Sequence, residues 1–494
     1  MTSYRFPKAI LDQIRLALPE ETSLFGDRPR FPTTYLPAGH AKALHPDNML
    51  VVGMRGVGKS HWYQALQDGA QRTLIGKNYS RSGLSEQTIV SVGFGETISP
   101  HDYPGKDSLA KLTDALETRH IWRTIVLTHL ARCHQPESPL GQLETWTQRI
   151  DWIQEHPEEM EQLVCGTDTM LEQKGVHHLI LFDALDRSAD DWQSMRKLVK
   201  GLLQTLLEFR TCRRIRLKAF LRPDHLEDPS VTAFPDASKV SLNAVNLSWR
   251  NHELFGLLWQ YLANAEENHL FIQGCQEGFG IGWSSQHGRR EVPEALRNDE
   301  QMQRKVFHAL TGPFMGEHPR RGFPYTWVPN HLEDTAQQVF PRSFLAALRY
   351  AADNDGVDEY PYALHYENIK KGVRNASRIR IQEMQEDYPW IEPLMRPLAG
   401  FAVPCPFETL AARWEREDVL NSLQQEMDAT REKAPPPHIG EGTSGVRKDL
   451  ENLGLFGRLS DDRVNMPDIY RIGYGLGRQG GRINYDALLT ELFG

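Results

Sequence analysis

A short glycine-rich stretch near the N-terminus constrains the fold of this chain more than any other segment. Residues 49–60 read MLVVGMRGVGKS, in which an apolar run leads into the pattern G-x-x-x-x-G-K-S of a phosphate-binding loop. Glycines permit the tight turn that directs successive backbone N–H groups at phosphates. Lys59 would add a positive charge, and the Ser60 hydroxyl would be a ligand of Mg²⁺. The predicted ligand-contacting residues of this loop are Gly53, Met54, Arg55, Gly56, Val57, Gly58, Lys59, Ser60 and His61.

The residues on either side of the loop fit the same interpretation. A buried strand is predicted before it, and residues 61–66 (HWYQAL) continue in a helical pattern after it. The positive end of such a helix faces a bound anion. A glycine-rich turn that arose by chance would not need a buried strand before it and a helix after it, so this alternative is disfavoured. No guanine-reading N-K-x-D follows the loop, so we expect ATP with Mg²⁺ rather than GTP as the ligand.

Composition excludes several classes of protein. The 494 residues are enough for two or three domains. A formal net charge of −9 gives no global basic field, so nucleic-acid binding would need a local patch. Five scattered cysteines without C-x-x-C argue against a disulfide framework and a zinc site, and fit a reducing cytosol. Residues 1–18 lack the apolar core of a signal peptide, and no apolar run has the length of a membrane span. We therefore expect a cytoplasmic protein.

A second motif lies at residues 178–187, HLILFDALDR. An apolar run ending in an acid is typical of a central parallel strand with a carboxylate at its carboxyl end. Asp183 is therefore predicted as the second Mg²⁺ ligand, together with Ser60. Asp186 has two interpretations, a catalytic base or a cap of the helix expected from about residue 189. The predicted catalytic residues are Lys59, Asp183 and Asp186.

Arg222 ends a further predicted strand, residues 217–222. Ligands of doubly wound sheets bind at the carboxyl ends of the strands, so Arg222 is a candidate sensor of the γ-phosphate. A last strand is predicted at residues 240–242, and a helix is expected to begin after Ser248. Two arginine pairs, at 289–290 and 320–321, could serve a neighbouring subunit, although exposed arginines without such a role are more common.

The C-terminal half is predicted to be helical. Pro341 suits the first turn of a helix from which Arg342 projects. Residues 366–381 form a basic amphipathic helix, for which a solvated face is favoured over a nucleic-acid contact. Three helical segments and a hairpin then follow in the pattern of a winged helix, whose third helix carries Arg447. Because basic residues are few, protein docking is slightly favoured over DNA reading. The segments are 408–414, 418–427, 444–453 and 454–466.

Together these motifs resemble an ASCE-type P-loop ATPase, closest to the STAND and AAA+ groups, including stand-alone ATPases of bacterial anti-phage and conflict systems. The resemblance is carried by the phosphate loop, the strand ending at Asp183 with 186–187 after it, Arg222, the 249–250 segment and Pro341-Arg342-Ser343. It implies that Arg342 acts as a second γ-phosphate sensor. Many such ATPases place a glutamate directly after the Walker B aspartate, where this chain has Ala184, which implies slow, switch-like hydrolysis.

The resulting prediction is an α/β P-loop NTPase with a parallel doubly wound sheet, a helical lid and a C-terminal winged-helix domain. It would bind and hydrolyse ATP, assemble with copies of itself, and pass its state to a protein effector in a defence or conflict system. The alternatives are a DNA-binding ATPase of transposition or replication type, and a degenerate NTPase that serves as a scaffold. The predicted domains are 1–45 (N-terminal extension), 46–244 (ATPase), 245–400 (lid) and 401–494 (winged helix).

Overall fold

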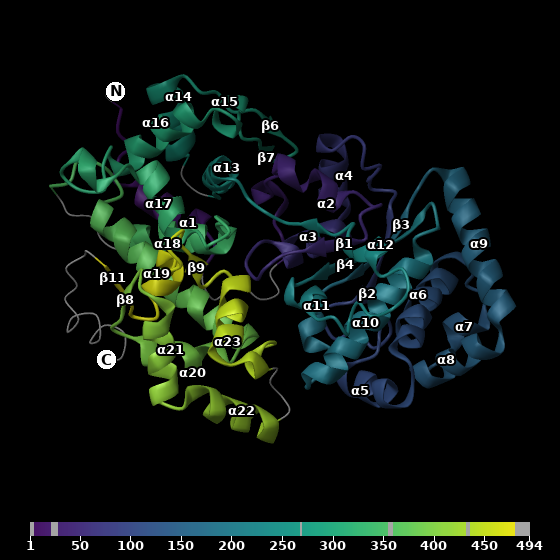
Figure 1. Ribbon diagram of the computed structural model, residues 1–494. Helices are drawn as coiled ribbons and strands as arrows, with labels where there is room; N and C mark the ends of the chain where they lie inside the picture. The colour runs from purple at the N-terminus through teal and green to yellow at the C-terminus, as the bar shows by residue number, and fades with distance from the viewer. Residues whose placement is uncertain (1–3, 21–27, 267–268, 354–358, 431–434, 480–494) are drawn as a thin grey trace. The chain divides into compact units, whose positions relative to one another are not determined.

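The computed structural model describes residues 4–20, 28–266, 269–353, 359–430 and 435–479. The chain divides into two compact units (Figure 1). Leu36–Ser248 form the first, here called the sheet unit, and Met1–Tyr35 with Trp249–Gly494 form the second, here called the helical unit. None of the helices in the described ranges combines the length and the apolar character needed to cross a bilayer.

The sheet unit is built on five parallel strands in the order β2-β3-β4-β1-β5. Parallel neighbours need long crossover connections, which helices supply here. The glycine-rich loop follows β1, the strand between β4 and β5. The strands are β1 Leu50–Val52, β2 Ile89–Phe94, β3 His178–Phe182, β4 Ile215–Leu221 and β5 Val245–Asn246.

The helices of the sheet unit form where apolar residues recur at helical spacing. The loop leads directly into α3, and the amphipathic stretch 192–209 is helix α10. The helices are α2 Ala41–Leu44, α3 Lys59–Gln67, α4 Gly69–Asn78, α5 Lys106–Ala115, α6 Thr118–His134, α7 Pro139–Gln142, α8 Trp146–Glu155, α9 Pro157–Lys174, α10 Trp192–Phe209, α11 Asp224–Glu227 and α12 Ser238–Ser241.

Helices cover both faces of the sheet, because successive side chains of a strand point to opposite sides. On one face, Phe182 of β3 packs edge-to-face against Trp122 of α6, with ring centroids 5.8 Å apart. On the other face, Phe220 of β4 packs in the same way against Tyr63 of α3, at 6.3 Å. All four rings are buried, and the sheet is doubly wound as predicted.

Two local predictions near the end of this unit are wrong. Residues 240–242 are not a strand: they close the short helix α12, and the last strand, β5, lies at Val245–Asn246. Helix α13 has Arg250 at its N-cap rather than Ser248. The Arg250 N–H donates to the Glu253 carboxylate at 2.9 Å, which fixes that helix start.

The helical unit centres on two helices, α18 and α19, which approach closely. A Cβ at Gly372 of α19 would lie 2.0 Å from the Ala347 carbonyl oxygen of α18, so only glycine fits there. Pro341 begins α18, as predicted. The helices are α1 Ile10–Ala17, α13 Asn251–Ala263, α14 Leu270–Phe279, α15 Glu294–Arg297, α16 Glu300–Thr311, α17 Pro324–Leu332, α18 Pro341–Asp353, α19 Tyr366–Asp387, α20 Ile391–Met395, α21 Phe407–Arg416, α22 Val419–Thr430, α23 Gly442–Asn452 and α24 Asp468–Arg471.

The C-terminal part of this unit has the arrangement of a winged helix. Helices α21, α22 and α23 precede an antiparallel hairpin of β9 and β10, and a bridge from Cys405 to Val464 extends the hairpin. Trp414 of α21 is buried and stacks on Phe456, which leads into the hairpin. The short strands of the helical unit are β6 Ser285–Gln286, β7 Arg289–Arg290, β8 Ala402–Val403, β9 Gly457–Arg458, β10 Val464–Asn465 and β11 Gly477–Arg478.

Candidate nucleotide-binding site

The glycine-rich loop turns through two left-handed residues before α3 begins. Gly56 has φ 84° and Gly58 has φ 109°, conformations that favour glycine. A Cβ at Gly53 would lie 2.5 Å from Cγ1 of Val57, so the start of the loop is also too close-packed for a side chain. Val57 is buried beneath the turn, whereas Met54 and Arg55 are half-buried. The loop therefore makes the tight turn that its glycines predict.

The Lys59 ammonium lies within the loop. Its Nζ donates to the carbonyl oxygen of Gly53 at 2.5 Å and to that of Met54 at 3.3 Å. Ser60 follows in the exposed first turn of α3. His61 packs edge-to-face on Trp62, and burial lowers the pKa of His61 to about 4, so this imidazole is neutral. The positive charge at the start of the helix therefore comes from Lys59.

Sheet register brings the three predicted strand ends to one edge. Val52 pairs with Leu221, and the Gly53 N–H donates to the Leu221 carbonyl at 3.1 Å. Strand β3 pairs with β4 on its other side, so Asp183 follows β3 at the same edge at which Arg222 follows β4. The carboxyl ends of parallel strands are where ligands bind in such sheets.

Asp183 is a buried carboxylate, 4% exposed. Burial raises its pKa to about 6, and Asp186 pushes it in the same direction. The Lys59 charge and a hydrogen bond with Ser60 oppose this shift. Asp183 thus shares a hydrogen bond with Ser60 and is influenced by the charge of Lys59. The carboxylate is held in an environment where a cation would stabilise its charged form.

Arg222 is held by two acids. It donates to Asp224 through Nε at 3.1 Å and Nη2 at 2.7 Å, and its Nη1 lies 3.6 Å from a carboxylate oxygen of Asp186. His225 Nε2 lies 2.9 Å from the other oxygen of Asp186. Although burial would raise the pKa of Asp186, Arg222 and His225 outweigh it and hold that pKa well below its usual range.

Asp186 does not cap the following helix, so this interpretation of it is wrong. The N-cap of α10 is Asp191, whose side chain accepts from the Ser194 N–H at 2.8 Å. Asp186 lies instead on the 3₁₀ turn Leu185–Arg187, within the charge cluster around Arg222.

Sequence reasoning missed several residues of this edge. Asp224 and His225 lie two and three residues after Arg222, so a search for charged residues just beyond the predicted strand would have found them. Glu96, two residues after β2, pairs with Arg187 at 2.6 Å, which links the ends of β2 and β3. Ala184 has φ 58°, so the position next to Asp183 is a left-handed turn with a methyl side chain.

Arg342 belongs to the helical unit, and its role as a second sensor stays a prediction. Its side chain forms an ion pair with Glu383 of α19. Of the arginines considered for a neighbouring subunit, Arg289 is 5% exposed and donates to Glu291 and the Thr34 carbonyl, so it has a structural role. Arg320 and Arg321 are exposed.

The residues at the strand ends fit ATP with Mg²⁺. The loop offers backbone N–H groups at the start of a helix, and Lys59 lies where phosphates would be contacted. Ser60 and buried Asp183 provide the oxygen ligands that Mg²⁺ prefers. Within the described ranges, no group of three or more His, Cys, Asp or Glu side chains gathers to hold a metal by itself.

Comparisons with known proteins add two distant structures. No family model matches the chain, and no curated protein matches it. The crystal structure of Cdc6p from Pyrobaculum aerophilum is similar with a TM-score of 0.30 and 11% identity, over 96% of this chain and 98% of that one. The Aeropyrum pernix ORC2 protein, solved as ADPNP–ADP complexes, gives a TM-score of 0.28 and 12% identity, over 97% and 96%. The assignment below rests on the sheet and loop geometry.

That geometry defines the class of fold. A parallel doubly wound sheet carries a glycine-rich loop between β1 and α3, with a buried aspartate at the end of β3. The chain has an α/β P-loop NTPase fold with a helical region and a C-terminal winged helix.

Proposed function

We propose that this protein is an ATP-binding molecular switch of the STAND/AAA+ type that hydrolyses ATP slowly. One observation carries the proposal: the glycine-rich loop with Lys59 and Ser60 follows β1, and buried Asp183, which shares a hydrogen bond with Ser60, follows β3 at the edge where Arg222 follows β4. This combination of groups is what a triphosphate with Mg²⁺ requires.

Each residue has a distinct part in binding. The N–H groups of the loop and the Lys59 ammonium would hold the β- and γ-phosphates, and Ser60 with Asp183 would hold the cation. Bound Mg²⁺ would neutralise phosphate charge. For Lys59 to contact phosphate, its Nζ must leave the carbonyl oxygens of Gly53 and Met54 to which it now donates.

Slow hydrolysis follows from how the acids at this edge are engaged. A carboxylate that acts as general base must lie within reach of the attacking water and be free to accept its proton. Ala184 supplies none, Asp186 is engaged by Arg222 and His225, and Glu96 is paired with Arg187. Such a site would keep ATP bound for long periods, which suits a switch more than a motor.

The switch would act through the helical unit. Arg222 from the sheet unit and Arg342 from the helical unit would both respond to the γ-phosphate, and the winged helix would pass the change to a partner. A ligand drives such a change only through its different affinity for the two states. The resemblance to conflict-system ATPases extends the proposal to homo-oligomers that act on a protein effector.

Lys59→Ala tests the proposal. Calorimetric titration with ATP·Mg²⁺ should show saturable binding to the wild type and a loss of at least about a hundredfold in affinity for Lys59→Ala. Lys77→Ala, which removes an exposed lysine of α4 in the same unit, is the matched control and should bind normally. Equal binding by both variants, or none by the wild type, would refute the proposal, the second outcome in favour of a scaffold.

The winged helix supports a second candidate, a DNA-binding ATPase. Arg447 is a poor probe of it, since that side chain donates to Glu451 at 2.8 Å and Asp462 at 3.0 Å and stacks on Phe407. Lys448, exposed on the same helix, is the better choice. Binding of duplex DNA that weakens steeply with salt and falls on Lys448→Glu would favour this candidate.

A further inference from the structure

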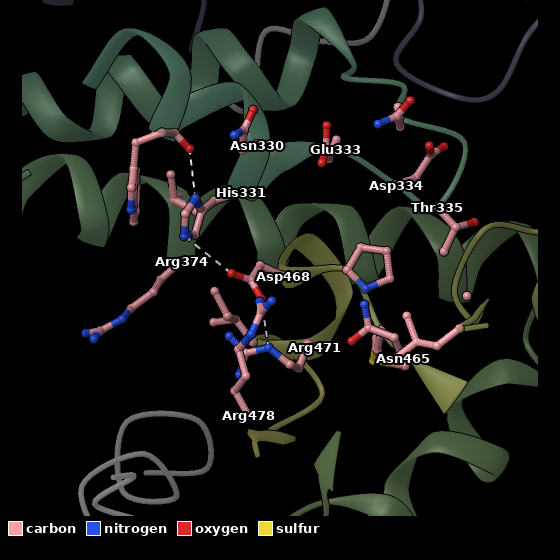
Figure 2. A pocket seen from close by; sticks show the side chains of 18 of the residues that line it. Asn330, His331, Glu333, Asp334, Thr335, Arg374, Asn465, Asp468, Arg471 and Arg478 are labelled. Atoms are coloured by element: carbon pink, nitrogen blue, oxygen red, sulfur yellow. Dashed lines mark hydrogen bonds and ion pairs between the residues drawn. The ribbon is translucent and has the colours of Figure 1, made fainter. Parts of the chain in front are cut away.

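The helical unit contains a large pocket lined by both charged and apolar side chains. Its volume is about 850 Å³, and it is lined by the end of α17, by α19, by the hairpin β9–β10, by α24 and by β11 (Figure 2). Sites for small molecules usually have volumes of about 300–1,000 Å³. The winged helix and the helices before it both contribute to its wall.

Asp468 lies at the centre of one side of the pocket. Its carboxylate accepts from Arg471 at 2.8 Å and from Arg478 at 3.1 Å. His331 Nε2 lies 3.5 Å away, but burial lowers the pKa of His331, so this ring is neutral near pH 7. One negative charge thus faces two guanidinium groups.

Arg374 of α19 lines the same pocket and is exposed. Within the described part of the chain, its guanidinium has no ion pair or hydrogen bond. Two further lining cations, Lys370 and Arg458, are paired with Glu367 and Asp462 outside the lining. The remaining three, Arg374, Arg471 and Arg478, face the single charge of Asp468, an excess of two. A phosphate monoester carries a charge of about −1.5 to −2 at pH 7, which matches this excess. Guanidinium groups are also the preferred bidentate partners of phosphate.

The other side of the pocket is acidic. Figure 2 shows Glu333 and Asp334 away from the arginines, with Asp468 between the two groups. Asp334 accepts from the N–H groups of Ala336 and Gln338, both at 2.9 Å, so that its position is fixed. Glu333 has no hydrogen bond or ion pair to other described residues. Burial and the neighbouring Asp334 raise the pKa of Glu333, so a hydrogen-bond donor placed there would be favoured.

We propose that this pocket binds a nucleotide-sized phosphate monoester. Its phosphate would lie against Arg374, Arg471 and Arg478, and its hydroxyl or amino groups would donate to Glu333 and Asp334. The volume, the excess of two positive charges on one side and the acceptors on the other together favour a ligand of this class. Inorganic phosphate would fill only the basic side, and an uncharged nucleoside would leave the arginines unmatched.

The test uses the full chain with Lys59→Ala, which silences the P-loop. The probes are the four ribonucleoside 5′-monophosphates and ribose 5-phosphate, each titrated calorimetrically. Arg374→Glu reverses the charge that has no ion pair with the residues the structure describes. Arg378→Glu is the matched control, because Arg378 is exposed one turn further along α19 and lies outside the pocket lining. Thermal unfolding of each variant checks that the fold is kept.

We expect at least one probe to bind saturably, Arg374→Glu to weaken it tenfold or more, and Arg378→Glu to change it less than twofold. For a bound nucleotide, the nucleoside without phosphate should not bind. Absence of binding by all five probes, or binding that Arg374→Glu leaves intact, would overturn the proposal. So would duplex DNA that binds through Arg374 when the small probes do not, since the phosphates would then be those of a nucleic-acid backbone. Because the P-loop is silenced throughout, these outcomes are independent of ATP binding.

Discussion

The guanidinium of Arg222 makes two hydrogen bonds to the carboxylate of Asp224, from Nε at 3.1 Å and from Nη2 at 2.7 Å. Bidentate pairs of this kind are among the stronger hydrogen-bonded contacts in proteins. Arg222 is 8% exposed, so the pair is shielded from water. A γ-phosphate that engages Arg222 must therefore compete with Asp224 for the same donors.

Asp224→Asn should strengthen ATP binding by this argument. The neutral amide competes less than a carboxylate for the Arg222 guanidinium. Arg222 still has the Asp186 carboxylate as an ion-pair partner, with 3.6 Å between Nη1 and the carboxylate oxygen. We expect the dissociation constant for ATP to fall about three- to tenfold, with that for ADP unchanged, as measured by calorimetry. Asp236→Asn, at an acid paired with Lys239 on the surface, is the control. Equal effects on ATP and ADP would show that Arg222 does not distinguish the γ-phosphate.

Asp183→Asn should stabilise the nucleotide-free protein near neutral pH. The pKa of Asp183 is raised by burial to about 6 in the folded state, against about 3.9 in an unfolded chain. Well below pH 4 both states are protonated, and the group costs nothing. Between pH 4 and 6 the unfolded chain ionises first, so stability falls by up to about 3 kcal/mol and stays lower above pH 6.

The thermal midpoints of Asp183→Asn and wild type should therefore lie closest together well below pH 4 and separate by pH 7, with the variant higher. Mg²⁺ with ATP should reverse the order, because the amide is a poorer ligand for the cation. A variant that is less stable at pH 7 without ligand would show that the charged carboxylate is better solvated than its burial indicates.

Sequence was most informative where chemistry dictates local structure. A phosphate-binding loop needs a tight glycine turn to present its backbone N–H groups beside Lys59. The motif that encodes this turn also requires a strand before it and a helix after it, so both elements could be predicted. The apolar run before Asp183 predicts a buried strand for the same reason. The amphipathic stretch 192–209 matches α10 because its apolar face is wide enough to set the helix boundaries.

Tertiary contacts determine the features that the sequence did not predict: the position of the last strand, the burial of Arg380 and the partners of Asp186. Residues 240–242 carry strand-forming side chains, but the chain pairs with β1 only at β5, five residues after Val240. Arg380 was grouped with the solvated basic face of its helix, yet it is fully buried between Phe340 and Tyr470. The partners of Asp186 come from the chain after β4, a contact that no local spacing reveals.

Asp186→Asn separates catalysis from binding. If Asp186 orients the attacking water, the variant should lose at least about tenfold in kcat while its affinity for ATP changes less than about threefold. Single-turnover hydrolysis and equilibrium titration measure the two quantities separately. Glu96→Gln tests the second candidate for this role, the acid that pairs with Arg187. A loss of kcat in Glu96→Gln but not in Asp186→Asn would show that Glu96, not Asp186, orients the attacking water.

The last prediction concerns Glu383, which joins two arginines in the helical unit. One carboxylate oxygen lies 3.3 Å from Nη1 of Arg380, whose side chain is fully buried, and the other pairs with Arg342. Arg380 also lies near the Tyr470 hydroxyl of α24, with both nitrogen–oxygen distances at 3.4 Å. Removing one partner of a buried charge pair typically costs about 3–5 kcal/mol, because the other charge remains in a poorly solvating environment.

Glu383→Gln should therefore lower the thermal midpoint of the protein strongly, equivalent to about 3 kcal/mol, whereas Glu415→Gln at an exposed acid of α21 should change it little. Arg342→Ala should cost less than Glu383→Gln, since Arg342 is partly exposed and its removal leaves the Arg380–Glu383 pair in place. Equal losses in Arg342→Ala and Glu383→Gln would mean that Arg342, not Arg380, depends on this carboxylate. That result would assign Arg342 to the framework of the helical unit and weaken its case as a nucleotide sensor.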